Sequence, residues 1–197
     1  MLYYIFLSYK FIATGTSCLL GILYLKLWGI KCFWDTRLFG IPGIEVSNSS
    51  KISIGHKCIL RSARWSNIAG ITRPIRLSAR FGGNITIGNN CGLSGTVIVS
   101  ENSVTIGNNV QIGVNCTIID TDFHPLNAYE RSIPKSRGHS LPIIIEDDVW
   151  LGMNVIVLKG VKIGSQTVVG AGSVVTHSLP PKVLAAGNPA KVIRILD

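Results

Sequence analysis

The chain has 197 residues and a formal net charge of +9, from 19 basic and 10 acidic side chains. This length fits one domain with a sizeable core, and the positive charge fits acidic partners such as phosphates or anionic lipid. The basic residues are dispersed and are not interleaved with aromatic side chains, which argues against a nucleic-acid-binding protein. Five scattered cysteines without a CxxC pair favour free thiols in a reducing compartment.

The first part of the chain differs in composition from the rest. Residues 2–34 are rich in large apolar and aromatic side chains and contain three charges, at Lys10, Lys26 and Lys31. The uncharged run between the first two lysines rises about 22 Å as a helix, short of a hydrocarbon core of about 30 Å. We treat residues 1–40 as a hydrophobic helical segment. Two interpretations stay open, a cap over the end of the fold and a membrane contact through residues 2–34.

An unbroken six-residue repeat runs from residue 145 to residue 180. Its first place always holds a branched aliphatic residue, at Ile145, Leu151, Val157, Ile163, Val169 and Val175. A helix requires apolar residues at a spacing of 3.6, and a strand with one buried face requires a spacing of two. Neither fits as a single long element, whereas short strands joined by tight turns and stacked into one aliphatic column do. The repeat therefore predicts an all-β fold, a parallel β-helix.

The same register occurs earlier in the chain. Ile-Gly pairs open hexads at Ile54, Ile87, Ile106 and Ile112, so we assign residues 41–197 to the β-helix domain, which closes with a short C-terminal tail. Three cysteines fall at the fifth place of a hexad and are predicted to be small buried hydrophobes: Cys58, Cys91 and Cys116. The repeat fails in the loop 120–142. Because the repeats build the scaffold, we expect the chemistry in this break.

Four motifs, in this order and spacing, carry a resemblance to a known family. They are DFHP at 122–125, DDVWLG at 147–152, GAGSVVT at 170–176 and AAGNPAKVIR at 185–194. Over about residues 52–194 the chain resembles the hexapeptide-repeat acyltransferases, close to the maltose and galactoside acetyltransferases and most like the O-acetyltransferases of bacterial surface polysaccharides. The resemblance implies a left-handed β-helix, acetyl-CoA as co-substrate, direct transfer without an acyl-enzyme, no metal, and a homotrimer with active sites between protomers.

The resemblance also implies which residues meet the acceptor. His124 corresponds to the catalytic base, and an imidazole can accept the proton of an attacking hydroxyl at neutral pH. Asp120 or Asp122 would orient the ring, although a carboxylate that caps a turn is equally ordinary. Ser94 stands where galactoside acetyltransferases have a substrate-contacting asparagine. It would bond a sugar hydroxyl, with a plain turn residue as the alternative.

The coenzyme contacts follow from the same motifs. Trp150 and Gly152 would lie beside the acetyl group and the pantetheine arm, and Trp150 would also border the acceptor. Small side chains let backbone groups approach the pantetheine, and charge-assisted bonds suit phosphates. The pantetheine positions are Ala171 and Gly172. The positions near the adenosine phosphates are Thr176, Lys191 and Arg194.

The loop residues 127–140 would reach a neighbouring protomer and shape the acceptor site. Their three cationic side chains suggest an acidic or phosphorylated glycan as acceptor: Arg131, Lys135 and Arg137.

These observations predict an acetyl-CoA-dependent O-acetyltransferase that acts on a sugar hydroxyl of a bacterial surface polysaccharide or its precursor. The alternatives are an N-acetyltransferase of an amino sugar or xenobiotic, and a non-catalytic β-helix binding protein. A zinc enzyme on a similar β-helix would need three converging histidines, and the four histidines lack the required close pair. We expect a cytoplasmic protein, either free or held at the cytoplasmic face of the inner membrane.

Overall fold

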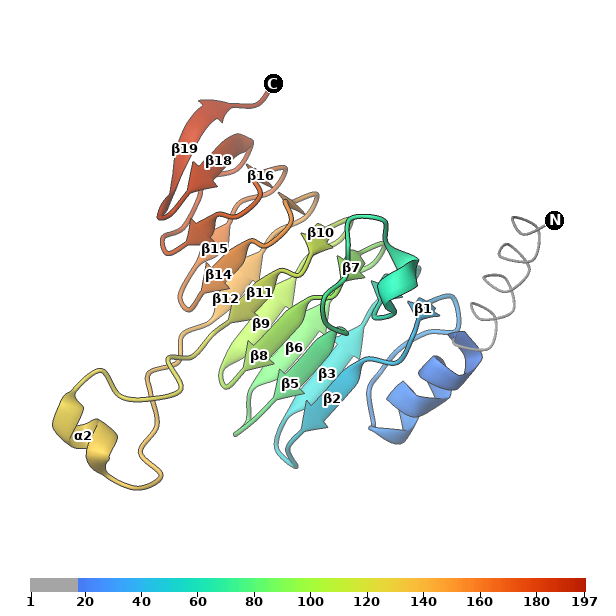
Figure 1. Cartoon of the computed structure of the whole chain (residues 1–197), viewed down its shortest axis with the longest axis horizontal. Coiled ribbons are helices and arrows are strands. Elements are labelled where there is room, and N and C mark those ends of the chain that lie inside the picture. Colours follow the sequence, from blue (N-terminus) through green and yellow to red (C-terminus); the bar gives the residue numbers. More distant parts are fainter. Residues whose placement is uncertain (1–17) are drawn as a thin grey trace.

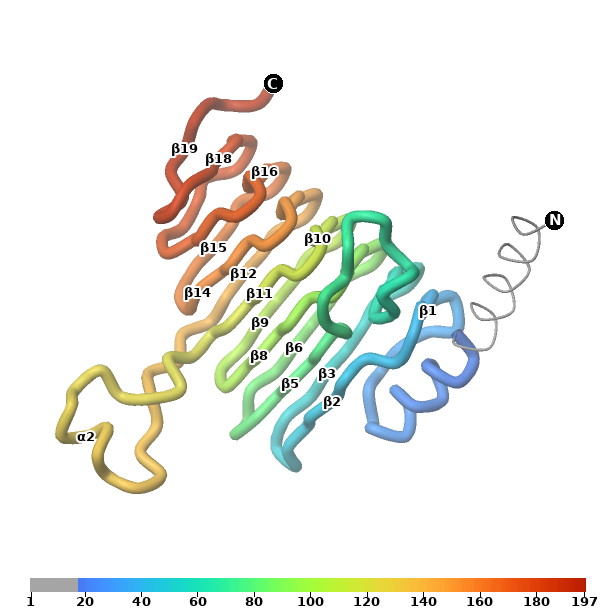
Figure 2. Tube along the Cα trace, viewed as in Figure 1, coloured from blue at the N-terminus to red at the C-terminus, as the bar shows by residue number. Residues whose placement is uncertain are grey.

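Short strands of two to six residues alternate with tight turns along most of the chain. The computed structural model describes residues 18–197, in which the strands form coils that stack along one axis (Figures 1 and 2). Each coil gives one strand to each of three sheets, which we call A, B and C. Neighbouring strands run parallel, apart from the final antiparallel pair. The predicted all-β parallel β-helix is confirmed.

The three sheets take their strands in turn. Sheet A contains β3 (Lys51–Ile54), β6 (Asn84–Ile87), β9 (Ser103–Ile106), β12 (Ile143–Ile145) and β15 (Lys162–Ile163). Sheet B contains β1 (Arg37–Phe39), β4 (Ile59–Arg61), β7 (Gly92–Ser94), β10 (Gln111–Val114), β13 (Trp150–Leu151), β16 (Val168–Val169), β18 (Val183–Gly187) and β19 (Ala190–Ile195). Sheet C contains β2 (Gly43–Val46), β5 (Arg76–Ala79), β8 (Val97–Ser100), β11 (Thr117–Ile119), β14 (Ile156–Leu158) and β17 (Val174–Val175).

Columns of aliphatic side chains hold the coils together. In sheet A one column joins five isoleucines in register, Ile54, Ile87, Ile106, Ile145 and Ile163. All five are buried, as are the predicted first-place residues of the unbroken repeat. Burying one such side chain contributes about 1.5–3 kcal/mol. The core is therefore continuous along the axis, and no single coil could form it.

The turns between sheets A and B explain the Ile-Gly pairs. A Cβ atom on Gly88 would overlap the backbone of Gly107 on the next coil, so the coils can stack only if this position has no side chain. Asn90 and Asn109 follow in the left-handed region, at φ of 57° and 58°. The amide nitrogen Nδ2 of Asn90 donates to Oδ1 of Asn109 at 3.2 Å. Asparagine tolerates this conformation, and its side chain also ties one turn to the next.

The fifth-place cysteines are buried free thiols, as predicted. Each donates a hydrogen bond to a glycine carbonyl of the following coil, at 3.1 Å, from Cys58, Cys91 and Cys116. Burial raises the pKa of the Cys116 thiol to about 11, so this group stays protonated at neutral pH.

Helical residues 18–27 pack against the first coil, with Ile22 and Leu25 in the core. The backbone of Leu38 on β1 hydrogen-bonds the Cys18 thiol. The exposed residues of this helix are four leucines and one lysine: Leu19, Leu20, Leu23, Lys26 and Leu27. Lys10 and the rest of the 2–34 segment before residue 18 lie outside the described residues. Among residues 18–197, no helix is both long enough and apolar enough to cross a membrane. The boundary at residue 40 stays a prediction.

Two insertions leave the coils without breaking their register. The predicted loop 120–142 leaves between β11 and β12, at the corner of sheets C and A, and contains α2 (Ala128–Ser132). The Asn127 side chain caps this helix by accepting from the backbone N–H groups of residues 129 and 130. A second insertion, residues 62–75, lies between β4 and β5 at the corner of sheets B and C and contains η1 (Arg64–Ser66).

Adjacent isoleucines of β12 test the core. Ile145→Ala removes a fully buried side chain, so we expect the free energy of unfolding to fall by about 2–5 kcal/mol. Ile144→Ala removes its half-exposed neighbour and is expected to cost less than about 1 kcal/mol. Urea denaturation of both variants, followed by circular dichroism, gives the comparison. Equal losses in the two variants would contradict the assignment of the core.

Candidate active site

A cleft of about 650 Å³ runs along the outward face of sheet B, and we call it the sheet-B cleft. Side chains alternate along a strand, so the residues between the buried ones point outward here. The lining residues are Arg61, Asn67, Ala69, Gly92, Ser94, Gln111, Ile112, Gly113, Val114, Trp150, Gly152, Met153, Val168, Gly170, Ala171 and Leu184. Four of the predicted site residues are thus brought together: Ser94, Trp150, Gly152 and Ala171.

Glycine backbone forms part of the floor of the cleft, at Gly92, Gly113, Gly152 and Gly170. A Cβ atom on Gly113 would come within 2.6 Å of the Gly152 backbone, and one on Gly152 within 2.5 Å of the Ala171 nitrogen. The close stacking of these turns therefore excludes larger residues. Beside them stands Trp150, whose residue surface is 56% exposed. An exposed indole next to a backbone floor can cover a flexible chain laid along the cleft.

The end of the cleft nearer the N-terminus is polar. Ser94 is buried, and its Oγ accepts a hydrogen bond from Nδ2 of Asn67 at 3.1 Å. Arg61 on β4 lies opposite Ser94 on β7, and Gln111 on β10 lies opposite Gly92. The hydroxyl, the amides and the guanidinium offer donors and acceptors suited to a polar ligand.

Sequence reasoning missed Arg61, Asn67 and Gln111. Asn67 belongs to the insertion 62–75, which carries no recognisable motif. One signal was present. Asn89 and Asn108, on successive coils, are 19 residues apart, whereas Ser53 and Thr86 on successive coils are 33 residues apart. That excess length marks a second break in the repeat.

The other end of the cleft is closed by the antiparallel pair β18–β19. Lys191 lies opposite Ala186, and Arg194 lies opposite Leu184, which lines the cleft. Residues opposite each other in an antiparallel pair share a face, so both cations lie on the cleft side of sheet B. Gly172 sits at the turn next to Ala171, with open space where a side chain would be.

Thr176 lies apart from the cleft. It follows β17 of sheet C, and its Oγ1 shares a hydrogen bond of 2.8 Å with Nδ1 of His177. It is absent from the cleft lining, and its assignment to the adenosine phosphates stays a prediction.

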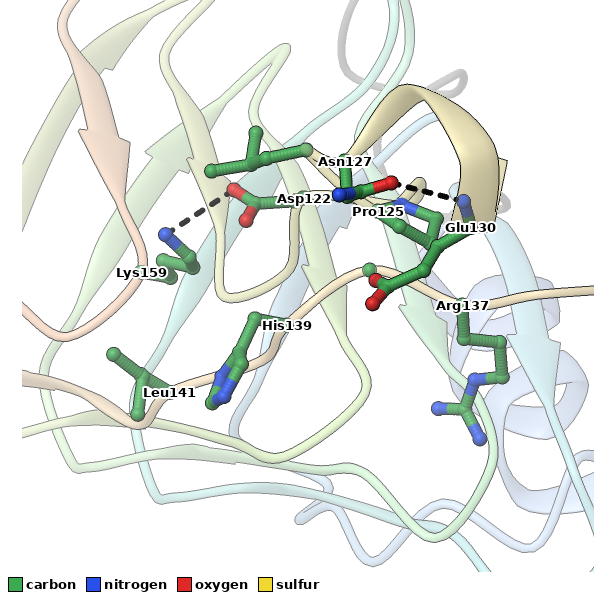
Figure 3. Close-up of a pocket in the computed structure, with 10 residues that line it drawn as sticks. Asp122, Pro125, Asn127, Glu130, Arg137, His139, Leu141 and Lys159 are labelled. Atoms are coloured by element: carbon green, nitrogen blue, oxygen red, sulfur yellow. Dashed lines mark hydrogen bonds and ion pairs between the residues drawn. The ribbon is translucent and has the colours of Figure 1, made fainter. Parts of the chain in front are cut away.

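A second cavity, of about 510 Å³, lies in the loop 120–142, and we call it the loop pocket (Figure 3). Asp122, His139 and Lys159 line it. Oδ1 of Asp122 pairs with Nζ of Lys159 at 3.2 Å, while its Oδ2 is buried and finds no hydrogen-bond partner within residues 18–197. Asp122 therefore keeps one acceptor available for a further donor.

His124 lies on the surface of the same loop. It follows Phe123, whose φ of 61° is uncommon for an aromatic residue. A Cβ atom on Gly138 would approach the His124 carbonyl oxygen to 2.7 Å, so close backbone packing fixes this turn. The His124 side chain is exposed and does not line the loop pocket, whereas His139 does. Sequence reasoning gave His139 no role.

Asp120 is fully buried and forms part of the scaffold. Its carboxylate accepts hydrogen bonds from the Ser100 hydroxyl and from the backbone N–H groups of Glu101 and Asn102, at 2.7–2.9 Å. These three donors close the turn between β8 and β9, which agrees with the turn-capping alternative. No hydrogen bond joins the carboxylates of Asp120 or Asp122 to the His124 ring, and the orienting role stays a prediction.

Two of the three loop cations are engaged within the chain. Arg137 pairs with the buried Glu101 at 3.0 Å and lies over the Phe81 ring. Arg131 donates to the backbone carbonyls of Pro125 and Leu126. No group of three or more His, Cys, Asp or Glu side chains suited to a metal ion occurs in the part of the chain that the structure describes.

The repeat matches a known family model, Bacterial transferase hexapeptide (six repeats), over residues 142–177. A hexapeptide-repeat-containing acetyltransferase of Vibrio cholerae, solved with acetyl coenzyme A, is 31% identical. The match covers 76% of this chain and 72% of that one, with a TM-score of 0.56. The chain belongs to the hexapeptide-repeat acetyltransferase family. The predicted family is confirmed, and with it the left-handed β-helix.

Curated relatives of this acetyltransferase family agree. Galactoside O-acetyltransferase of Escherichia coli K12 is 42% identical over 66% of this chain and 62% of its own length. Galactoside O-acetyltransferase of Lactococcus lactis is 36% identical over 73% of this chain and 63% of its own length. The chain thus spans slightly less than two thirds of these relatives.

Proposed function

We propose that the protein is an acetyl-CoA-dependent O-acetyltransferase acting on a sugar hydroxyl of a bacterial surface polysaccharide or its precursor. The sheet-B cleft carries this proposal, because it combines a backbone floor, an exposed Trp150 and a polar end at Ser94. Relatives whose names describe galactoside O-acetyltransferases support transfer to a sugar oxygen.

Acetyl-CoA would lie lengthwise in the sheet-B cleft. Lys191 and Arg194, on the cleft side of β19, suit the phosphates, since charge-assisted bonds to a polyanion are strong. Pantetheine would follow the small-residue floor at Gly152 and Ala171. The thioester would then point towards Ser94, where the acceptor binds.

His124 is proposed as the general base. Acetyl-CoA supplies an activated acyl group as its thioester. As the acceptor oxygen attacks the thioester carbonyl, His124 takes the hydroxyl proton, and the same proton can pass to the departing thiolate of CoA. Asp122, one acceptor oxygen of which is buried and unpartnered within residues 18–197, is suited to hold a histidine ring once the site is complete.

A complete site requires a second copy of the chain. The His124 loop leaves at the corner of sheets C and A, whereas the strands of sheet B form the third side of the coils (Figure 1). The residues that line the cleft are mostly on these sheet-B strands and the turns beside them. Within one chain, His124 and Ser94 therefore lie on different sides of the coils, which supports a site completed by a neighbour. In the proposed homotrimer, each protomer contributes His124 to the cleft of a neighbour, and the neighbour also covers Trp150.

We also propose that the protein meets its acceptor at the cytoplasmic face of the inner membrane. The outward face of the helical residues 18–27 is apolar, with Leu27 87% exposed, and Lys26 and Lys31 lie beside it. Apolar side chains with nearby lysines suit an anionic membrane surface, and a lipid-linked glycan would be presented there.

Alanine variants of the two loop histidines, His124 and His139, show which of them acts as the general base. We expect His124→Ala to lower acetyl transfer by a factor of about 10²–10⁴, because the hydroxyl then keeps its proton. His139→Ala should stay near wild type. The measurement is CoA thiol release with glycan precursors as acceptors, and a hydroxylamine-labile product identifies an ester. Loss of transfer in His139→Ala alone would assign the base to His139 instead.

Mixed oligomers test the shared site. Trp150→Ala should weaken acetyl-CoA binding about tenfold or more, because the indole no longer covers the coenzyme. When His124→Ala and Trp150→Ala chains are produced together, some clefts combine an intact Trp150 with an intact His124 from a neighbour. Transfer should therefore exceed the sum of the two variants assayed separately at the same concentration. A simple sum would mean that each site is built from one chain.

Vesicle sedimentation tests the membrane contact. Leu27→Asp should weaken binding to anionic lipid vesicles about tenfold or more, since it puts a charge where an exposed leucine met the lipid. Leu126→Asp, at a leucine 82% exposed in the loop 120–142, is the matched control and should bind as wild type does. Equal binding of all three proteins would remove the helix from the contact.

A further inference from the structure

Two arginines share one aromatic ring beside the polar end of the sheet-B cleft. The guanidinium carbons of Arg37 and Arg61 lie 5.5 and 5.3 Å from the centroid of the Phe39 ring. Arg61 on β4 is paired in register with Phe39 on the neighbouring strand β1, and Arg61 lines the cleft. Stacking on an aromatic face holds a guanidinium in place and leaves its N–H groups directed to other partners.

Neither arginine has an acidic partner within residues 18–197. Three of the other arginines there do: Arg76 and Arg80 pair with Glu45, and Arg137 pairs with Glu101. Burial, and then the repulsion from Arg37, hold the pKa of the Arg61 guanidinium below its usual value. Two like charges at a partly buried site are unfavourable until an anion joins them.

The position of Arg61 connects this pair to the acceptor. Arg61 lies opposite Ser94, whose hydroxyl accepts from Asn67 and keeps its own hydrogen to donate. From β4 to β18 the cleft spans five strand spacings of about 4.8 Å, roughly 24 Å. With the coenzyme phosphates at the β19 end, the anion at Arg61 has to belong to a different molecule.

We propose that Arg61, with Arg37 beside it, forms a subsite for an anionic substituent of the acceptor, a carboxylate or a phosphate. This inference rests on the proposed function. The planar fork of a guanidinium binds either anion through two parallel hydrogen bonds. The subsite makes the protein selective for acidic sugars. The residues responsible lie on β1 and β4 and not in the loop 120–142, because Arg131 and Arg137 of that loop already bind groups of their own chain.

Matched acceptors test the subsite in the full-length protein. Methyl β-D-glucuronide and methyl β-D-glucoside share the 2-, 3- and 4-hydroxyls, and the first has a carboxylate where the second has a primary 6-hydroxyl. Methyl glucoside 6-phosphate provides the phosphate arm. We expect kcat/KM for at least one anionic acceptor to exceed that for the glucoside about tenfold or more. The increase should come from a lower KM for the anionic acceptor. The preferred acceptor shows whether the subsite binds a carboxylate or a phosphate substituent.

Two arginine variants and one control complete the test. Arg61→Gln should abolish the preference, and the exposed Arg37→Gln should reduce it, while the affinity for acetyl-CoA, whose phosphates are proposed to bind at the β19 end, is retained. Lys51→Gln removes one positive charge from the outward side of sheet A and should keep the preference. Urea denaturation of each variant confirms that it is folded.

Direct binding separates this inference from the proposed function. Saturation-transfer NMR with CoA present should detect methyl β-D-glucuronide or methyl glucoside 6-phosphate on the wild type and neither on Arg61→Gln. That result supports the subsite even if no acceptor is acetylated. Acetylation of all three acceptors with equal kcat/KM in wild type and Arg61→Gln would overturn the subsite and leave the function standing. A loss of acetyl-CoA affinity in Arg61→Gln would also overturn it, because this end would then hold the coenzyme.

Discussion

The vertical stacking of aliphatic side chains governs the rest of this structure. Residues such as Ile106 and Ile145 must meet in register across β9 and β12. Each coil therefore has to place its strands directly over those of the previous coil in all three sheets. The stacked turns add a second demand, since Gly88 and Gly152 leave no room for a side chain. Extra residues can enter only at the corners, where the chain leaves one sheet and starts the next.

The two insertions illustrate this constraint. The loop 120–142 separates β11 from β12, yet both strands keep their places in sheets C and A. The insertion 62–75 is fastened over its corner, with Nη2 of Arg73 donating to Oγ1 of Thr117 at 2.6 Å and Nδ2 of Asn115 donating to the Gly70 carbonyl. Variation at the corners thus leaves the core intact. Each insertion contributes polar side chains to a cavity, Asn67 to the sheet-B cleft and His139 to the loop pocket.

The scaffold was predictable from the sequence because its cause is repetitive. A branched aliphatic residue at every sixth position indicates which side chains face inward. The burial of Cys58, Cys91 and Cys116 was predicted from their fifth place in the repeat. The family resemblance pointed to Ser94, Trp150, Gly152 and Ala171, which the fold gathers in one cleft. Contacts between distant segments have no such local signal. The bond from Asn67 to Ser94 and the stacking of Arg37 and Arg61 on Phe39 depend on which strands become neighbours. Asp120 illustrates the converse, since this carboxylate next to the DFHP motif closes a turn between two strands.

The regular rise of the coils also sets the length of the sheet-B cleft. Its floor grows by one strand spacing, about 4.8 Å, with each coil between β4 and β18. Point substitutions change the side chains that line the cleft, but they do not alter its length. Gaining or losing a whole coil would alter it in a single step while preserving every aliphatic column. The span between the two ends of the cleft can therefore take only discrete values, so a ligand that bridges both ends is selected by its extended length as well as by its chemistry.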